Sequence, residues 1–171
     1  IILHLMGSHN RYPERVPDSF LETHSLPKEM PYPKYTPSLL YTDYVLQEIF
    51  EYAQKNLNLQ SMIYFSDHGE DMKYMHTASP FYFSMVRIPF WIYLSPKYQK
   101  EYPEILPNLK NHSQSVFTND LIFDTVSGLL HTDTNFYHPE YDITNKKYSI
   151  TRENAKTRHG KRNISEEQVA N

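Results

Sequence analysis

The sequence predicts an α/β layered fold with a largely parallel sheet, because three short apolar runs are separated by an amphipathic segment and long loops. The runs cover residues 1–6, 62–65 and 88–94. Each has the length and the nearly continuous apolar character of a strand buried on both faces. Pro89, near the start of the third run, indicates the beginning of a strand or an edge position.

Two helices are expected between and after these strands. Thr36 followed by Pro37 is typical of a helix start, and apolar side chains then recur at helical spacing, which predicts an amphipathic helix over residues 38–56. A second helix is expected to open at residues 118–120. Residues 7–36 are rich in proline and show no period, so a long loop is predicted there, of a kind that is often functional.

Composition limits the possible classes of protein. The 171 residues fit one domain, and a net charge of −3 gives no general signal for nucleic-acid binding. The absence of cysteine excludes disulfides and thiolate metal sites and leaves the compartment open. No apolar run approaches the ~20 residues that a membrane-spanning helix needs.

Two further predictions concern the first and the last residues of the chain. The first residues form an apolar run with no initiator methionine, so we expect a fragment whose upstream part holds any targeting segment. We expect residues 144–171 to be a polar, basic tail that follows the folded part of the chain. That tail is interpreted either as solvated or disordered, or as a basic segment that touches anionic lipid.

Polar residues follow two of the predicted strands. The first run continues into Gly7-Ser8-His9, and the second continues into Ser66-Asp67-His68-Gly69-Glu70. In open parallel sheets, ligands bind at the carboxyl ends of the strands. The intervening helix has the length of a crossover between adjacent parallel strands, so we expect His9 to lie near Asp67 and His68.

Asp67 and His68 are the most informative pair. A carboxylate next to an imidazole suits zinc, and a turn at Gly69 would let both side chains converge on one ion. The alternative is a capping aspartate and a surface histidine in a loop. His76 is either a ligand, a donor to a phosphate oxygen or a solvated loop residue, and Glu70 is either a residue that holds a ligand in place or a helix-start charge.

A series of short motifs in fixed order covers roughly residues 1–143. It comprises His4 to His9, Tyr12-Pro13, Leu40 to Val45, Tyr64 to Glu70, Met75-His76, Ile88 to Ile92 and Ser113 to Ser115. This series resembles the phosphoethanolamine transferases that modify lipid A or lipopolysaccharide core, within the sulfatase and alkaline-phosphatase superfamily. The Ser-Asp-His-Gly-Glu element is its most specific piece.

The resemblance implies that residues 1–143 are the C-terminal portion of a sulfatase-like catalytic domain with an alkaline-phosphatase-like fold, incomplete in this chain. It implies that this domain lies in the periplasm and is anchored in the inner membrane by upstream helices, with this fragment itself soluble. It implies one or two zinc ions, with Asp67 and His68 as metal ligands. His9 and His76 match catalytic, substrate-binding histidines near the phosphate or a second metal. The donor would be phosphatidylethanolamine and the acceptor lipid A or lipopolysaccharide core, with no nucleic-acid partner. The threonine nucleophile and a further acidic ligand would lie upstream of Ile1.

Three other functions remain open at this level. The same metal pair serves sulfatases and phosphatases, which transfer to water, and phosphoglycerol transferases, which act in lipoteichoic acid synthesis. The third is a non-catalytic module in which Asp67 and His68 are structural. Because the nucleophile and part of the ligand set are missing, we expect this chain alone to lack transferase activity and to hold zinc weakly or not at all.

Overall fold

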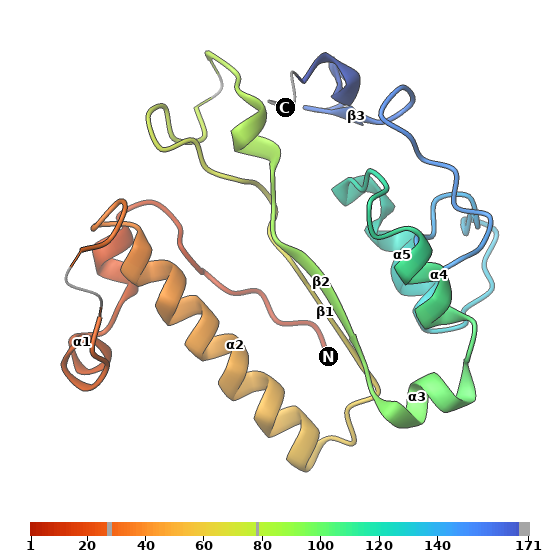
Figure 1. Cartoon of the computed structure of the whole chain (residues 1–171), viewed down its shortest axis with the longest axis horizontal. Coiled ribbons are helices and arrows are strands. Elements are labelled where there is room, and N and C mark those ends of the chain that lie inside the picture. Colours follow the sequence, from red (N-terminus) through yellow and green to blue (C-terminus); the bar gives the residue numbers. More distant parts are fainter. Residues whose placement is uncertain (27–28, 78, 168–171) are drawn as a thin grey trace. The chain divides into compact units, whose positions relative to one another are not determined.

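The computed structural model describes residues 1–26, 29–77 and 79–167 (Figure 1). Residues 27–28 of the predicted loop and residues 168–171 of the predicted tail lie outside the described part. The chain divides into two compact units, residues Ile1–Leu59 and Gln60–Asn171. No helix among the described residues is long and apolar enough to cross a membrane.

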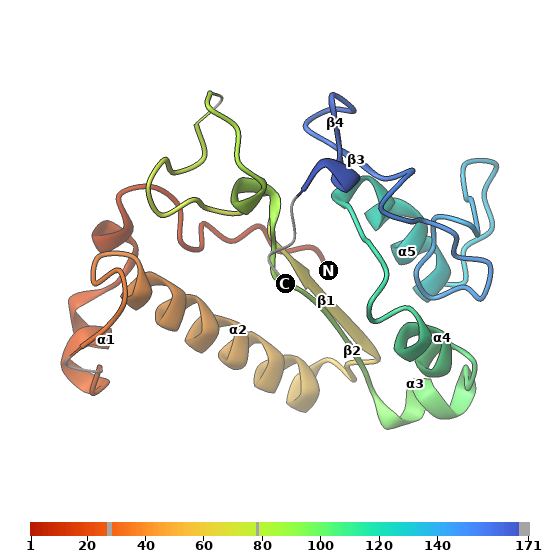
Figure 2. The same ribbon diagram turned by 45° about the horizontal axis from the view of Figure 1, so that its top comes forward.

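The first unit is built around one long helix. This helix, α2, covers Thr36–Asn56 and confirms the prediction for residues 38–56, beginning at the expected Thr36-Pro37 pair. Upstream, the predicted loop contains the 3-10 helix η1, Tyr12–Arg15, and the short helix α1, Asp18–Thr23 (Figure 2). Phe20 of α1 is buried, and its ring lies 5.1 Å from that of Tyr41 in α2.

Residues 1–6 do not form the predicted strand. They have no regular secondary structure, and Ile1 and Ile2 are 98% and 97% exposed. A strand needs a partner for its backbone hydrogen bonds, and the described residues of the first unit contain no other strand. The prediction of a strand over residues 1–6 is therefore wrong, because an apolar run needs a neighbouring strand and the described part of this unit offers none.

The second unit contains the main sheet. Strand β1, Ser61–Phe65, pairs with β2, Phe90–Leu94, and the two strands run antiparallel with Ile63 opposite Ile92. Both predicted strands are thus confirmed, but the largely parallel arrangement is wrong for the described residues. Among its described residues, the connection over 66–89 holds only the 3-10 helix η2, Phe83–Val86. Without a helical crossover the chain returns beside β1 in the opposite direction.

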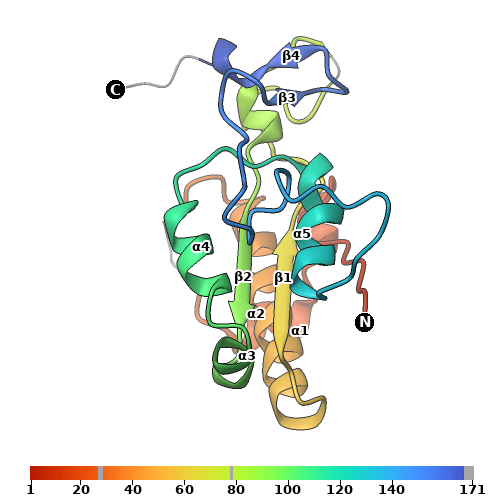
Figure 3. The same cartoon turned by 90° about the vertical axis from the view of Figure 1, so that its right-hand side faces the viewer.

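Short helices cover one face of this sheet. They are α3, Pro96–Glu101, α4, Ile105–Asn111, and α5, Ile122–Leu129, which follows the 3-10 helix η3, Asn119–Leu121. Figure 3 shows α4 and α5 on the same side of β1 and β2. The core cluster joins β2 to these helices through Leu94, Tyr98, Ile105 and Leu129. The helix expected to open at residues 118–120 is confirmed.

The chain after residue 143 has local structure of its own. Two short antiparallel strands, β3, Lys156–Thr157, and β4, Arg162–Asn163, are followed by the 3-10 helix η4, Ile164–Glu166. The backbone N–H of Ile164 donates to the carbonyl oxygen of Ala155 over 3.1 Å, and Ala155 is buried. These contacts form a small closed hairpin at the end of the described chain.

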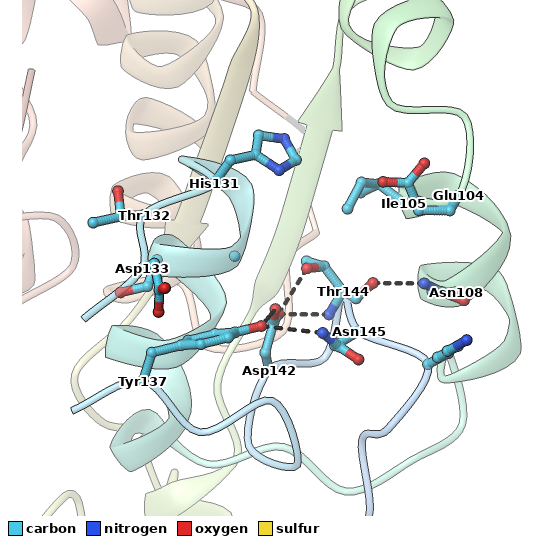
Figure 4. Close-up of a pocket in the computed structure, with 13 residues that line it drawn as sticks. Glu104, Ile105, Asn108, His131, Thr132, Asp133, Tyr137, Asp142, Thr144 and Asn145 are labelled. Atoms are coloured by element: carbon cyan, nitrogen blue, oxygen red, sulfur yellow. Dashed lines mark hydrogen bonds between the residues drawn. The ribbon is translucent and has the colours of Figure 1, made fainter. Parts of the chain in front are cut away.

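A buried carboxylate organises the region between α4 and α5. Asp142 is 1% exposed and accepts hydrogen bonds from the Thr144 backbone N–H (2.8 Å), the Thr144 hydroxyl (2.7 Å) and the Tyr137 hydroxyl (2.8 Å). Figure 4 shows this network at the side of a pocket of about 540 Å³. Burial raises the pKa of Asp142 above its ordinary value of 3.8, although these hydrogen bonds oppose the shift.

We predict that Asp142→Asn changes the pH dependence of stability. Because the folded-state pKa of Asp142 is raised, its stabilising contribution is complete below about pH 3.8 and is lost as the pH rises through the folded-state value. The asparagine cannot ionise, so the free energy of unfolding of the variant, minus that of the wild type, should increase with pH over that interval. Urea unfolding at a series of pH values measures this difference.

Tyr137→Phe is the matched control, because it removes one hydrogen bond to Asp142 but keeps the buried carboxyl group. It should shift the free energy of unfolding and keep a pH dependence of the same sign as the wild type, extended to higher pH because a hydrogen bond that lowers the pKa of Asp142 is removed. An unchanged slope in Asp142→Asn would contradict the assignment of this slope to Asp142.

Candidate functional site

The Ser66–Glu70 turn lies just past the carboxyl end of β1, where the sequence placed it. Two side chains fix its backbone. The Asn119 amide donates to the carbonyl oxygens of Ser66 (3.1 Å) and Asp67 (3.0 Å), and the Ser66 hydroxyl donates to the carbonyl oxygen of His68 (2.8 Å). The backbone around Asp67 is therefore held from within the turn and from η3.

Gly69 is required by the close approach of another part of the backbone. Its N–H donates to the carbonyl oxygen of Met85 over 2.8 Å. A Cβ atom at this position would lie 2.2 Å from the carbonyl oxygen of Arg87 and 2.4 Å from that of Ser84. Since these are backbone atoms, they cannot move aside as the tip of a flexible side chain can. Glycine at position 69 thus lets the turn pack directly against residues 84–87.

The orientation of His68 follows from its neighbour. His68 Nδ1 lies 2.8 Å from the carbonyl oxygen of Gly69. A carbonyl oxygen only accepts, so Nδ1 carries the hydrogen and the lone pair of the neutral ring is on Nε2. Nε2 lies 4.0 Å from Oδ2 of Asp67, whose side chain is 86% exposed. Two ligands of a tetrahedral zinc ion, each bonded at ~2.0–2.1 Å, lie roughly 3.4 Å apart. The exposed Asp67 carboxylate would therefore have to move toward Nε2 of His68 for both atoms to bind one ion.

His76 lies directly beside this pair. Its ring centroid is 4.4 Å from that of His68, with 34° between the ring planes. His76 Nδ1 is 3.0 Å from Oε2 of Glu70, and the Glu70 side chain is only 7% exposed. The structure therefore brings together Asp67, His68 and His76, with Glu70 as the hydrogen-bond partner of His76.

Asp71 shapes the loop that carries His76. Its carboxylate accepts from the backbone N–H groups of Lys73 (2.9 Å) and Tyr74 (2.8 Å) and from the Ser84 hydroxyl (2.6 Å). These hydrogen bonds, led by that of Ser84, lower the pKa of Asp71. Sequence reasoning missed this role, although aspartate is a common residue at the start of such turns.

Asn119 was also missed in this role, since the sequence indicated only a helix start. Its contacts reach residues that precede it by 52 and 53 positions, so no local pattern could reveal them. Polar residues at the start of a helix are expected to bond within that helix.

His9 lies in the first unit, in an exposed position after Gly7, which has a left-handed backbone (φ 51°). A position beside Asp67 was expected because a crossover would join two parallel strands, but residues 1–6 are not a strand. That His9 shares the site with Asp67 and His68 stays a prediction.

The donors at this turn do not make a complete metal site. Within the described ranges, no group of three or more histidine, cysteine, aspartate or glutamate side chains is arranged to hold a metal ion. The pocket of Figure 4 is lined by none of the four residues singled out from the sequence, His9, Asp67, His68 and His76. Asp67 and His68 fit zinc by donor type, as two ligands of a set that needs more.

Comparison with known proteins defines the class. The model of the sulfatase family matches residues 1–132, so the chain belongs to the sulfatase family. Among curated relatives, it is 29% identical to phosphoethanolamine transferase EptA of Escherichia coli K12 over 163 residues. It is 28% identical to EptA of Helicobacter pylori over 168 residues. These matches cover 84% and 86% of this chain but only 30% and 31% of the relatives' length.

Solved structures show the same likeness. The C-terminal periplasmic domain of phosphoethanolamine transferase EptC from Campylobacter jejuni superposes with a TM-score of 0.67 at 26% identity, over 86% of this chain and 52% of that one. The corresponding domain from Escherichia coli, in complex with zinc, gives a TM-score of 0.65 at 23% identity, over 87% of this chain and 46% of that one. The expected resemblance to phosphoethanolamine transferases is confirmed, as is an alkaline-phosphatase-like fold for an incomplete domain.

We predict that Gly69→Ala destabilises the chain by about 3 kcal/mol, near the upper end of the usual cost of overpacking. The reason is the collision of the new methyl group with two backbone carbonyl groups. Urea unfolding measures the loss. The control is Gly160→Ala, because no described atom lies within 4 Å of the methyl group added there. Only the left-handed backbone of Gly160 (φ 76°) opposes this change, and it should destabilise the chain by about 1 kcal/mol. Equal costs for the two variants would argue against the close packing at Gly69.

Proposed function

We propose that this chain is part of a phosphoethanolamine transferase in which Asp67 and His68 bind zinc. One observation carries the proposal: the Gly69 carbonyl holds His68 with its Nε2 lone pair beside the Asp67 carboxylate, at the carboxyl end of β1. The similarity to EptA and EptC proteins supports the reaction class. The chain spans about a third of the length of the curated relatives, so the activity is proposed for the longer protein.

The side chains around the pair have separate roles. Zinc, when bound, would polarise phosphoryl oxygens and lower the pKa of the nucleophile. His76 donates from Nδ1 to Glu70, so it would donate from Nε2, as the imidazolium, to the transferring phosphoryl group and offset its charge. We assign His9 a similar part, on the basis of its motif. The threonine nucleophile and the remaining metal ligands would come from residues upstream of Ile1.

The partners follow from the same proposal. Phosphatidylethanolamine would be the donor, and lipid A or lipopolysaccharide core the acceptor. The longer protein would be held in the inner membrane, with this region in the periplasm, where the similar C-terminal domain of Campylobacter jejuni EptC lies. Residues 1–143 would belong to the catalytic domain and residues 144–171 would form its basic C-terminal segment.

We expect Asp67→Ala in the longer protein to abolish both zinc binding and transfer, because a catalytic zinc site has few ligands and this change removes one of them. The 171-residue chain alone should show no turnover and little zinc binding. The assay follows a labelled phosphatidylethanolamine analogue with lipid A as acceptor, and elemental analysis gives the metal content. Asp133→Ala, an exposed aspartate outside the turn, is the control and should retain activity.

Three results would count against the proposal. Full activity in Asp67→Ala would mean that the metal site lies elsewhere, and robust turnover by the 171-residue chain would mean that the nucleophile lies within these residues. Release of phosphoethanolamine to water without transfer to lipid would instead indicate a hydrolase of the same family.

We expect substitutions of Glu70 to lower kcat/KM, and to lower it more when they remove the hydrogen-bond acceptor of His76 completely. Glu70→Gln keeps an oxygen that can accept from His76 Nδ1, so its kcat/KM should fall only about tenfold. Glu70→Ala removes the acceptor, and its kcat/KM should fall about a hundredfold. Losses of this size are usual for residues that hold functional side chains in place. Steady-state kinetics measures both, and the melting temperature shows whether the fold persists. Equal activity of the two variants would indicate that the hydrogen bond to His76 has no catalytic part.

A further inference from the structure

The hairpin of β3 and β4 concentrates positive charge. Residues 156–163, here named the basic hairpin, contain Lys156, Arg158, His159, Lys161 and Arg162, and no carboxylate. All five of these side chains belong to exposed residues. The hairpin lies outside the residues that match the sulfatase family model, which end at residue 132. Its charge is therefore a feature that the family assignment does not explain.

The basic hairpin is attached to the loop of the candidate site. The guanidinium groups of Arg158 and Arg162 lie over the ring of Phe81, at 5.4 and 5.7 Å from its centroid. Just beyond the hairpin, Glu167 pairs with Arg87 at 2.9 Å and with Arg152 at 3.6 Å. Glu166 pairs with Arg162 at 2.9 Å, so the charge of this arginine is partly neutralised and the two lysines of the hairpin matter most below. Figure 3 shows β3, β4 and the loop between β1 and β2 at the same end of the second unit, with α3 at the opposite end.

The same loop exposes apolar side chains. Met72 is 38% exposed, Met75 is 37% exposed and Tyr82 is 37% exposed. These residues flank His76 and Phe81 in the sequence, so they lie on the loop to which the basic hairpin is attached. Exposed cations and exposed apolar side chains thus lie at the same end of the second unit (Figure 3). This combination binds the boundary between lipid headgroups and acyl chains.

We propose that the basic hairpin and the apolar residues of this loop form a surface that binds anionic lipid headgroups. The lysine and arginine side chains would contact the phosphates, and Met72, Met75 and Tyr82 would enter the headgroup layer. This inference rests on the proposed function, because it brings Asp67 and His68 to a membrane that holds lipid donor and acceptor. A nucleic acid is a less suitable ligand, because its phosphates would contact the cations but nothing in it would bury the methionines. The net charge of −3 of the whole chain also disfavours a nucleic acid.

Vesicle sedimentation with the 171-residue chain tests this surface without any need for turnover. The probes are vesicles of phosphatidylcholine alone and vesicles that also contain phosphatidylglycerol. We expect binding only to the anionic vesicles, and loss of that binding at high salt. The double variant Lys156→Gln/Lys161→Gln should weaken the partition coefficient about tenfold or more. Met72→Ser/Met75→Ser should also weaken it severalfold, by removing apolar burial.

The matched control is Lys97→Gln/Lys100→Gln, which removes two lysines from α3 at the other end of the unit. It should bind like the wild type, and thermal unfolding should be the same for all of the lysine variants. Binding that the hairpin variant leaves unchanged, equal binding to neutral vesicles, or tighter binding to an oligonucleotide than to anionic vesicles would overturn the inference. Failure of the proposed transferase activity would leave the vesicle result unaffected, so the two failures are distinguishable.

Discussion

The contact between Gly69 and the backbone of residues 84–87 is the constraint on which the candidate site depends. It joins the turn after β1 to the segment that enters β2 through the hydrogen bond from Gly69 to Met85. From that segment, the Ser84 hydroxyl reaches Asp71, which shapes the loop before His76, and Arg87 reaches Glu167 near the end of the described chain. A side chain at position 69 would separate the turn from the segment, and the positions of His68 and His76 would no longer be coupled.

The positions of β1 and β2 and the polar residues after β1 could be predicted from the sequence, because an apolar run and the residues that follow it are local features. The same holds for α2, whose start, length and buried positions are all contained within its own residues. The similar run at residues 1–6 is not a strand, because a strand also needs a partner, which is not a local feature. The direction of β2 could not be predicted in this way. Strand pairing depends on the connection over residues 66–89, which has no periodic signal, and an apolar run fits a parallel or an antiparallel neighbour equally well.

The interpretation of Asp67 and His68 needed information of a different kind. A dipeptide of aspartate and histidine is compatible with a loop cap as well as with a metal site, and sequence alone left both open. The structure adds that the Gly69 carbonyl holds Nδ1 of the ring and that Asn119 holds the backbone around Asp67. Such main-chain contacts orient functional side chains in many metal sites, and they leave no trace in a residue pattern.

The charge of the basic hairpin has a consequence for how the molecule meets a charged surface. The chain has 17 lysine and arginine residues against 20 carboxylates, so removing the hairpin's four leaves 13 against 20. The remainder of the chain is thus repelled by a negative surface while the hairpin is attracted to it. When the molecule approaches such a surface, electrostatic forces favour orientations in which the hairpin faces the surface, before any specific contact forms. The molecule would therefore reach the surface already in the binding orientation, and a larger share of encounters would lead to binding.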